Sequence, residues 1–243
     1  MAAFEPLEFS HADRRRIYEH VERTGSVSAE DLPRNLGIDP TGFRHHVAIL
    51  KRDGLVAEGN GELWVDFEEG AEETFATGNW EVTIRQARQD DLEGLTGVIR
   101  EVASEKTDIV AESVADVLDH EEVLLRHNDV ASRMFFVATI DERVVGWVHL
   151  EAPELEKLAH TAKLTVGVLP DHQGHGIGTK LLERGLSWAG ASGYEKLYNS
   201  IPATNEAAIA FLESKGFETE AIREDHYKIG EEYADEVMMA IVV

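Results

Sequence analysis

The 243-residue sequence contains no cysteine. Disulfide bonds, thiolate metal ligands and covalent acyl-cysteine intermediates are therefore excluded. No apolar run approaches the ~20 residues of a membrane-spanning helix. The first residues, MAAFEPLEF, lack the basic and apolar regions of a secretory signal peptide. We therefore expect a cytoplasmic protein that makes no use of a membrane.

Lysine is also scarce: there are 8 Lys and 15 Arg against 47 acidic residues, and the formal net charge is −24. This composition resembles that of haloarchaeal proteins, in which concentrated salt screens the repulsion between surface charges. An ordinary acidic protein is the alternative. The halophilic interpretation predicts that folding and activity improve in molar salt. The charge is uneven, because residues 1–66 carry a net −4 and the other 177 residues a net −20.

Residues 1–67 predict a small domain of three helices followed by a β-hairpin. Each helix begins at a side chain that can cap its free N–H groups, namely Ser10, Ser28 and Asp39. Gly59-Asn60-Gly61 then separates two short apolar strands, as in a hairpin turn. This order resembles a winged helix-turn-helix domain.

The third predicted helix has two different faces. Phe43, Val47 and Leu50 form its apolar face. The opposite face is basic or small and polar, as a DNA-recognition helix requires, and its candidate DNA-binding residues are Thr41, Arg44, His45, Lys51 and Arg52. The weak net charge of this domain in so acidic a chain favours DNA as a partner. Winged helices also serve as dimerisation or ligand-sensing modules, so a homodimer stays an alternative.

Residues 68–79, EEGAEETFATGN, are acidic and contain glycine, which predicts a linker. Residues 80–243 predict a second domain of the α/β (α+β) class. Apolar periodicity and turn residues indicate the order β-α-α-β-β-β-α-β-α-β-β in this domain.

The second domain is organised around residues 164–196, in which a short strand is followed by three alternate glycines and an amphipathic helix. The glycines are Gly174, Gly176 and Gly178. Glycine lets a ligand approach the backbone, and the N–H groups of a helix N-terminus attract an anion. The loop does not match the dinucleotide pattern G-x-G-x-x-G, and it lacks the Gly-Lys-Ser/Thr ending of a P-loop.

Gln173-x-x-Gly176-x-Gly178 resembles the pyrophosphate-binding signature of the GNAT superfamily of N-acetyltransferases. Further along, NEAAIAFLESKGF, from Asn205 to Phe217, resembles the second motif of that family. The resemblance covers residues 80–243 and implies the GNAT acyl-CoA N-acyltransferase fold, with acetyl-CoA as the acyl donor.

The resemblance also implies roles for residues of these motifs. Backbone N–H groups of the glycine loop would hold the pyrophosphate, and the preceding strand would lie beside the pantetheine. The cofactor-binding residues implied are Val166, Val168, Gln173, Gly174, His175, Gly176, Ile177, Gly178, Thr179 and Asn205. A backbone N–H near Val168 would stabilise the oxyanion of the transfer step. A plain N-cap is the alternative role for Asn205.

One departure from the family concerns the acid that protonates the departing thiolate. Family members commonly carry a Tyr four residues before the Gly of Gly-Phe, and this chain has Leu212 there. Tyr227 is the preferred substitute, because the hairpin before the last strand often lines the acceptor site in this family. Tyr198 and Tyr233 are the other candidates, and a thiolate that leaves unprotonated is a further alternative.

The general base is also not fixed by a motif. Glu151, at the end of a strand, and His160 are the candidates. Lysine, with a pKa of about 10.4, needs a stronger base than an α-amino group at about 7.7–8.0. We therefore expect a protein α-amino group or a small-molecule amine as acceptor.

The histidines do not form a recognisable metal motif in the sequence. His120-Glu121 and His127 lack the spacing of a zinc-protease site, and His45-His46 has no partner ligands nearby in the chain. The sequence therefore predicts no metal. It predicts an N-acetyltransferase with a DNA-binding N-terminal module, and the alternative is a transcription regulator whose GNAT-like domain senses acyl-CoA without turnover.

Overall fold

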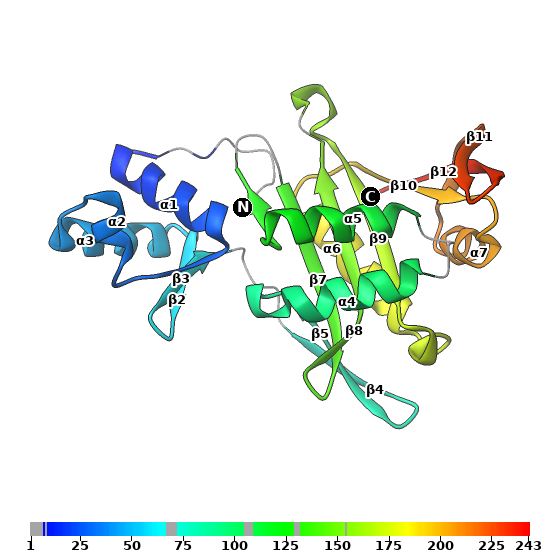
Figure 1. The fold of residues 1–243 in the computed structure, drawn as a ribbon, viewed down its shortest axis with the longest axis horizontal. Coiled ribbons are helices and arrows are strands. Elements are labelled where there is room, and N and C mark those ends of the chain that lie inside the picture. Colours follow the sequence, from blue (N-terminus) through cyan, green and yellow to red (C-terminus); the bar gives the residue numbers. More distant parts are fainter. Residues whose placement is uncertain (1–6, 8, 67–71, 105–108, 129–131, 154) are drawn as a thin grey trace.

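The computed structural model describes residues 7, 9–66, 72–104, 109–128, 132–153 and 155–243. The N-terminal domain, blue and cyan in Figure 1, lies to one side of a larger domain built on one sheet. Within the described residues, no helix combines the length and apolarity needed to cross a bilayer.

The N-terminal domain contains three helices and a three-stranded antiparallel sheet of order β1-β3-β2. Its elements are α1 (Ala12–Thr24), β1 (Ser26–Ser28), α2 (Leu32–Leu36), α3 (Pro40–Arg52), β2 (Val56–Gly59) and β3 (Glu62–Val65). Buried side chains from all three helices and the sheet form its core, including Ile17, Tyr18, Leu32, Leu50 and Leu63.

The predicted helices and hairpin are confirmed, with three differences. Helix α2 begins at Leu32, and its N-cap is Asp31 and not Ser28. The N-cap of α1 is His11 and not Ser10, because Nδ1 of His11 accepts the Asp13 N–H at 3.1 Å. Strand β1 was not predicted, since its three residues gain their partners only by pairing with β3. The cap of α3 is as predicted: the Asp39 carboxylate accepts the N–H groups of Thr41 and Gly42.

The larger domain is a nine-stranded sheet of order β11-β12-β10-β9-β8-β7-β5-β4, with β6 paired to β7. Its first elements are β4 (Glu73–Thr77), β5 (Trp80–Gln86), α4 (Leu92–Ala103), α5 (Ile109–Glu121), β6 (Arg126–His127), β7 (Ser132–Ile140) and β8 (Arg143–Ala152). They are followed by β9 (Thr161–Val168), α6 (Ile177–Ala191), β10 (Lys196–Pro202), α7 (Glu206–Ser214), β11 (Glu218–Ile229) and β12 (Glu232–Val242).

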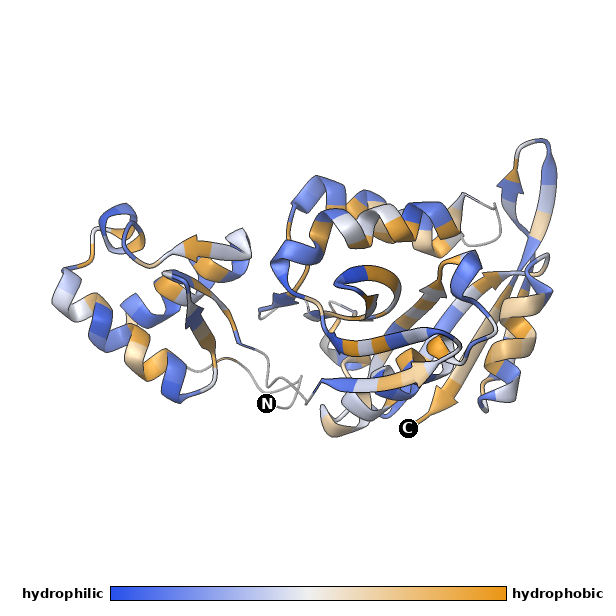
Figure 2. Cartoon of the chain, turned by 90° about the horizontal axis from the view of Figure 1, so that it is seen from below, coloured by the Kyte–Doolittle hydropathy of each residue, from blue (hydrophilic) through white to orange (hydrophobic). Residues whose placement is uncertain are grey.

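Helices cover both faces of this sheet: α4 and α5 lie over one face and α6 over the other (Figure 1). Successive residues of β8 therefore enter two different cores. Val148 and Leu150 pack on the side of α6, and Trp147 packs on the side of α4 and α5. Burial on both faces explains why the central strands are apolar with little alternation. Figure 2 shows apolar residues along the central strands and polar residues on the outer helix surfaces.

The predicted linker of residues 68–79 is wrong for residues 73–77, which form β4 at the edge of the sheet. Phe75 packs against the core beside α6, and the hydroxyls of Thr74 and Thr83 lie 3.1 Å apart across the two strands. The acidic composition hid this strand, because an edge strand buries few of its side chains. Residues 68–71 of the predicted linker lie outside the described residues.

Helix α1 joins the two domains through polar contacts. The Tyr18 hydroxyl donates to the carbonyl of His127 at 2.6 Å. The carboxylate of Glu22 accepts the Asn128 side-chain amide at 2.9 Å and lies 3.5 Å from the Arg126 guanidinium. Only 6% of Glu22 is exposed, so its charge is neutralised inside the junction. These contacts hold the N-terminal domain against β6.

Candidate active site

The glycine loop connects β9 to α6 in a conformation that requires glycine. Gly174 and Gly176 have φ angles of 74° and 81°, in the left-handed region that residues with a Cβ rarely adopt. Gly176 caps α6 without any side-chain hydrogen bond to the first turn. The first N–H groups of a helix have no acceptor within the helix, so this end of α6 offers donors to an anion.

The edge of the sheet supports the loop. The side-chain amide of Gln173 donates to the Val168 carbonyl at 2.9 Å, which ties the loop to the end of β9. Thr77 of β4 donates to the His175 carbonyl at 2.8 Å. The rings of His172 and His175 meet Trp80 edge-on, with centroids 4.6 and 5.0 Å away. Strand β4, absent from the sequence prediction, thus helps to position the loop.

Strands β9 and β10, both described in full, pair over only three positions. Parallel pairing joins residues 161–163 to residues 196–198. Beyond this point, residues 164–168 of β9 pair with β8, and residues 199–202 of β10 pair with β12. The two strands therefore separate next to the glycine loop. Backbone groups of β9 that face the gap are available to a ligand, because one edge of the strand has lost its neighbour.

Trp147 of β8 shapes the sheet beside this gap. A Cβ on Gly167 would lie 2.2 Å from the Trp147 ring, so only glycine fits at that position of β9. Trp147 is fully buried. Its packing explains the glycine between Val166 and Val168, which the sequence analysis had not interpreted.

Candidate residues for acid–base chemistry lie on the sheet face covered by α4 and α5. The register places Glu151, Lys163 and Tyr198 side by side across β8, β9 and β10. Burial raises the pKa of Tyr198, and the nearby Glu151 charge raises it further. Tyr198 is therefore a neutral phenol at physiological pH and keeps a proton that it can donate.

Glu236 of β12 is a functional candidate that sequence reasoning missed. Its carboxylate is buried, with 4% of the residue exposed. It accepts hydrogen bonds from the Tyr227 hydroxyl at 3.1 Å and from the Arg223 guanidinium at 2.8 Å. Burial alone would raise its pKa, but hydrogen bonds from Ser200 and Tyr227, with the His226 and Arg223 charges, hold it below its usual value. Glu236 is therefore ionised at neutral pH.

The sequence contained only a weak signal for Glu236, which is an acidic residue at the start of the last apolar run. Its orientation depends on the register of β12 against β10. That register pairs Glu236 with Pro202 and Met238 with Ser200, which places Glu236 and Ser200 on the same face as Tyr198.

The other candidates occupy different environments. Leu212 is 1% exposed and belongs to the core beside α6. Tyr233 is 63% exposed. The Asn205 side chain accepts the Ala208 N–H at 3.1 Å, so it caps α7. His160 is exposed, and its backbone carbonyl accepts the N–H of Glu195 at 2.8 Å. The Tyr227 side chain, in contrast, contacts a buried carboxylate, that of Glu236.

Comparison with known proteins agrees with this architecture. Residues 99–217 match the acetyltransferase (GNAT) family, and residues 9–58 match a helix-turn-helix domain. A [ribosomal protein bS18]-alanine N-acetyltransferase of Salmonella typhimurium is 35% identical over 105 residues, which are 43% of this chain and 68% of the relative. An N-alpha-acetyltransferase of Saccharolobus solfataricus is 25% identical over 161 residues, 62% of this chain and 88% of that protein.

A solved structure shares the fold of the larger domain. It is described as an acetyltransferase from Salmonella typhimurium with its cofactor acetyl-CoA. The alignment covers 66% of this chain and 93% of that chain, with 22% identity and a TM-score of 0.54.

The fold, the glycine loop and the separated strands define an acyl-CoA-dependent transferase. The chain belongs to the GNAT family of acetyltransferases, and it is an N-acetyltransferase that uses acetyl-CoA. A helix-turn-helix domain precedes its catalytic domain.

Proposed function

We propose that this enzyme acetylates the α-amino group at the N-terminus of a protein. The observation that carries the proposal is the gap between β9 and β10, which opens beside the glycine loop just beyond Lys163 and Tyr198, the last paired positions. The two relatives named above are a [ribosomal protein bS18]-alanine N-acetyltransferase and an N-alpha-acetyltransferase, which supports this class of acceptor.

The proposed donor site consists of the glycine loop and the end of β9. Backbone N–H groups between Gln173 and Thr179 hold the pyrophosphate at the N-terminus of α6. Val166 and Val168 present their backbone to the pantetheine in place of a neighbouring strand. Asn205 adds a cofactor contact to its role as N-cap of α7. Acetyl-CoA supplies the activated thioester at this site.

The proposed acceptor site lies around Glu236, on the same sheet face as Tyr198 and Ser200. Its carboxylate is ionised and buried, so it attracts the ammonium form of the acceptor. Arg223 is exposed enough to turn into solvent and leave its position to the acceptor, since 53% of its side chain is accessible. Tyr227 holds the carboxylate in place from the other side.

The proposed proton transfers use the row of side chains beside the gap. Glu151 takes a proton from the acceptor ammonium through intervening water, so that the amine can attack the thioester carbonyl. A backbone N–H near Val168 stabilises the negative charge on the carbonyl oxygen. Tyr198 or Tyr227 then protonates the departing thiolate, because the raised pKa of Tyr198 keeps its phenolic proton at neutral pH and the Tyr227 hydroxyl is a hydrogen-bond donor to Glu236.

The test measures CoA release with three acceptors. The first is a peptide with a free N-terminal alanine and no lysine, the second is the same peptide with an acetylated N-terminus and one internal lysine, and the third is spermidine. We expect turnover with the first acceptor. Turnover only with the second or third would assign a different acceptor class. Binding of acetyl-CoA with no CoA release from any of the three would favour the ligand-sensing alternative.

The N-terminal domain supports a second function, which is DNA binding through α3. Thr41, Arg44 and His45 are exposed on this helix, and residues 9–58 match a helix-turn-helix domain. Lys51 lies 2.7 Å from Glu58 of the hairpin and must exchange this partner for a phosphate. Arg52 similarly pairs with Asp53 at 2.8 Å. Arg44 is thus the best-placed residue to contact a base edge.

A further inference from the structure

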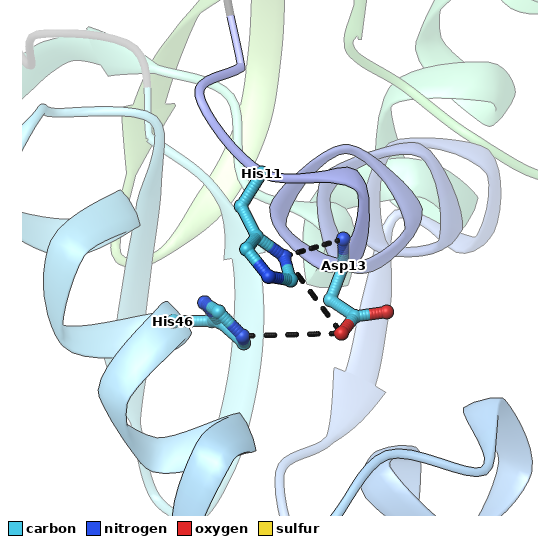
Figure 3. A group of neighbouring side chains, drawn as sticks. All are labelled: His11, Asp13 and His46. Carbon is cyan, nitrogen blue, oxygen red and sulfur yellow. Dashed lines mark hydrogen bonds and ion pairs between the residues drawn. The ribbon is translucent and has the colours of Figure 1, made fainter.

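His46 of α3 lies against the start of α1. The sequence left this histidine without partner ligands, and the tertiary structure supplies two. His11 and Asp13 come from the beginning of α1, 35 and 33 positions away in the chain. One potential ligand atom from each of the three side chains lies within 4.8 Å of the others. Figure 3 shows the two imidazoles and the carboxylate turned toward a common space.

The distances between the potential ligand atoms are slightly longer than those between the ligand atoms of a bound metal ion. The Asp13 carboxylate oxygen lies 3.8 Å from Nδ1 of His11 and 3.9 Å from Nε2 of His46, and the two imidazole centroids are 4.4 Å apart. Ligand atoms bound at about 2.0–2.2 Å from one ion stand about 3–3.5 Å apart. Small side-chain rotations therefore close the site, and His11 and Asp13 have room for them because 50% and 30% of their side chains are exposed. On binding an ion, Nδ1 of His11 gives up the Asp13 N–H that it accepts as the N-cap of α1.

We propose that His11, Asp13 and His46 bind a divalent first-row transition-metal ion such as Zn²⁺. Two imidazoles and one carboxylate are a ligand set that Zn²⁺ accepts, and three protein ligands leave a further position open. Magnesium and calcium prefer oxygen ligands and do not suit this set.

The state of His46 agrees with the proposal. Its side chain is 11% exposed. Its Nδ1 atom is buried and has no hydrogen-bond partner among the described residues.

Several charges act on an ion at this position. The Arg14 side chain and the positive end of the α1 dipole repel it. Asp13 attracts it through Oδ2, while its other carboxylate oxygen, Oδ1, accepts a hydrogen bond from Arg16 at 2.9 Å. The acidic character of the whole chain adds a weak attraction. Coordination to three ligands must offset the local repulsion, so the ion binds more weakly than in an all-cysteine site.

The ion would connect the start of α1 to α3. His46 follows Arg44 and His45, which are exposed on the proposed DNA-binding face of the same helix. A metal at this position therefore fixes the helix that carries that face.

The test uses Co²⁺ as a visible substitute for Zn²⁺, added to the full chain after treatment with a chelator. We expect ligand-field absorption that saturates at one Co²⁺ per chain and is lost on adding one equivalent of Zn²⁺. The variants are His11→Asn, Asp13→Asn and His46→Gln. Asparagine at position 11 keeps an N-cap for α1 while removing the imidazole. Each variant should weaken Co²⁺ binding by at least about a hundredfold. Loss of a residue that only hydrogen-bonds to a metal ligand already lowers metal affinity by up to about a hundredfold.

The matched control is His45→Gln, which removes the neighbouring exposed imidazole and should leave Co²⁺ binding unchanged. Circular dichroism of the metal-free variants checks that each is folded. The proposal is overturned if the wild-type chain develops no saturable absorption. It is equally overturned if His11→Asn and Asp13→Asn, both folded, bind Co²⁺ as the wild type does.

Discussion

The Tyr227 hydroxyl donates a hydrogen bond of 3.1 Å to Oε1 of Glu236, and this places a tyrosine next to a buried, ionised carboxylate at the last hairpin of the sheet. The two residues belong to neighbouring strands, β11 and β12, which pair in antiparallel register. The relationship gives Tyr227 an environment that its position in the sequence did not reveal.

Replacing Glu236 by Gln should weaken use of the amine acceptor. Loss of a charged hydrogen-bond partner costs about 1.5–3 kcal/mol, which is about a ten- to hundredfold decrease in kcat/KM. The decrease should appear mainly in KM for the amine, with KM for acetyl-CoA unchanged. Steady-state kinetics of Glu236→Gln and Tyr227→Phe test this, and Glu232→Gln, an exposed position of the same strand, is the control. Equal effects on both substrates would argue for a general loss of structure instead.

Replacing Gly176 by Val should prevent acetyl-CoA binding. Apart from its neighbours in the chain, no atom of the described residues lies within 4 Å of a Cβ at this position, so the new side chain occupies the space proposed for the pyrophosphate. The φ angle of 81° adds backbone strain of about 1–2 kcal/mol. Calorimetry should show at least a tenfold weaker affinity, about 1.4 kcal/mol. Gly37→Val is the control, because Gly37 has a φ of 64° and equally free space but lies in the N-terminal domain. If both variants bind acetyl-CoA alike, the loop does not hold the pyrophosphate.

Stability should fall in mild acid because of His149. This histidine is 1% exposed and stacks on Phe135 with ring centroids 4.4 Å apart. Burial lowers its pKa well below 6.5, and the Arg133 and Lys163 charges add to the effect. Below pH 6.5 the unfolded chain binds a proton that the folded chain does not bind, so the free energy of unfolding decreases by about 1.4 kcal/mol per pH unit. Above pH 6.5 this effect disappears.

Urea unfolding at pH 7.5 and 5.5 measures this contribution. The decrease between the two values should be about 1.4 kcal/mol smaller in His149→Phe than in wild type. His160→Gln, which changes an exposed histidine of the same domain, should retain the wild-type decrease. The same pH dependence in wild type and His149→Phe would contradict the assignment of a neutral buried imidazole.

Replacing Arg44 by Ala should reduce DNA binding and relax sequence preference, if α3 enters the major groove. An arginine that contacts a base edge contributes about 1–3 kcal/mol. Anisotropy titrations with promoter fragments at low and molar salt measure the loss, and Arg34→Ala, an exposed arginine on α2, is the control. Equal and weak binding by wild type and Arg44→Ala at both salt concentrations would leave dimerisation or protein docking as the role of this domain.

The sequence alone determined the features that depend on neighbouring residues. The glycine loop was recognisable because Gly174, Gly176 and the start of α6 follow one another, and their conformation is set by local backbone geometry. Asp39-Pro40 likewise marked the start of α3, because a cap and the residue after it act within one helical turn. The family motifs, the helix-turn-helix domain and the acetyl donor all followed from such local patterns.

The tertiary structure decided the relationships between residues distant in the chain. The composition of β4 is that of a linker, and its pairing with β5 and its contact with His175 are visible only in the structure. Glu236 is buried because the register of β12 turns it inward, and a shift of one residue would have turned it outward. His46 lies beside His11 and Asp13 because α1 packs against α3. The physical reason is the same in each case: strand register and helix packing place these side chains, and no short sequence pattern encodes either.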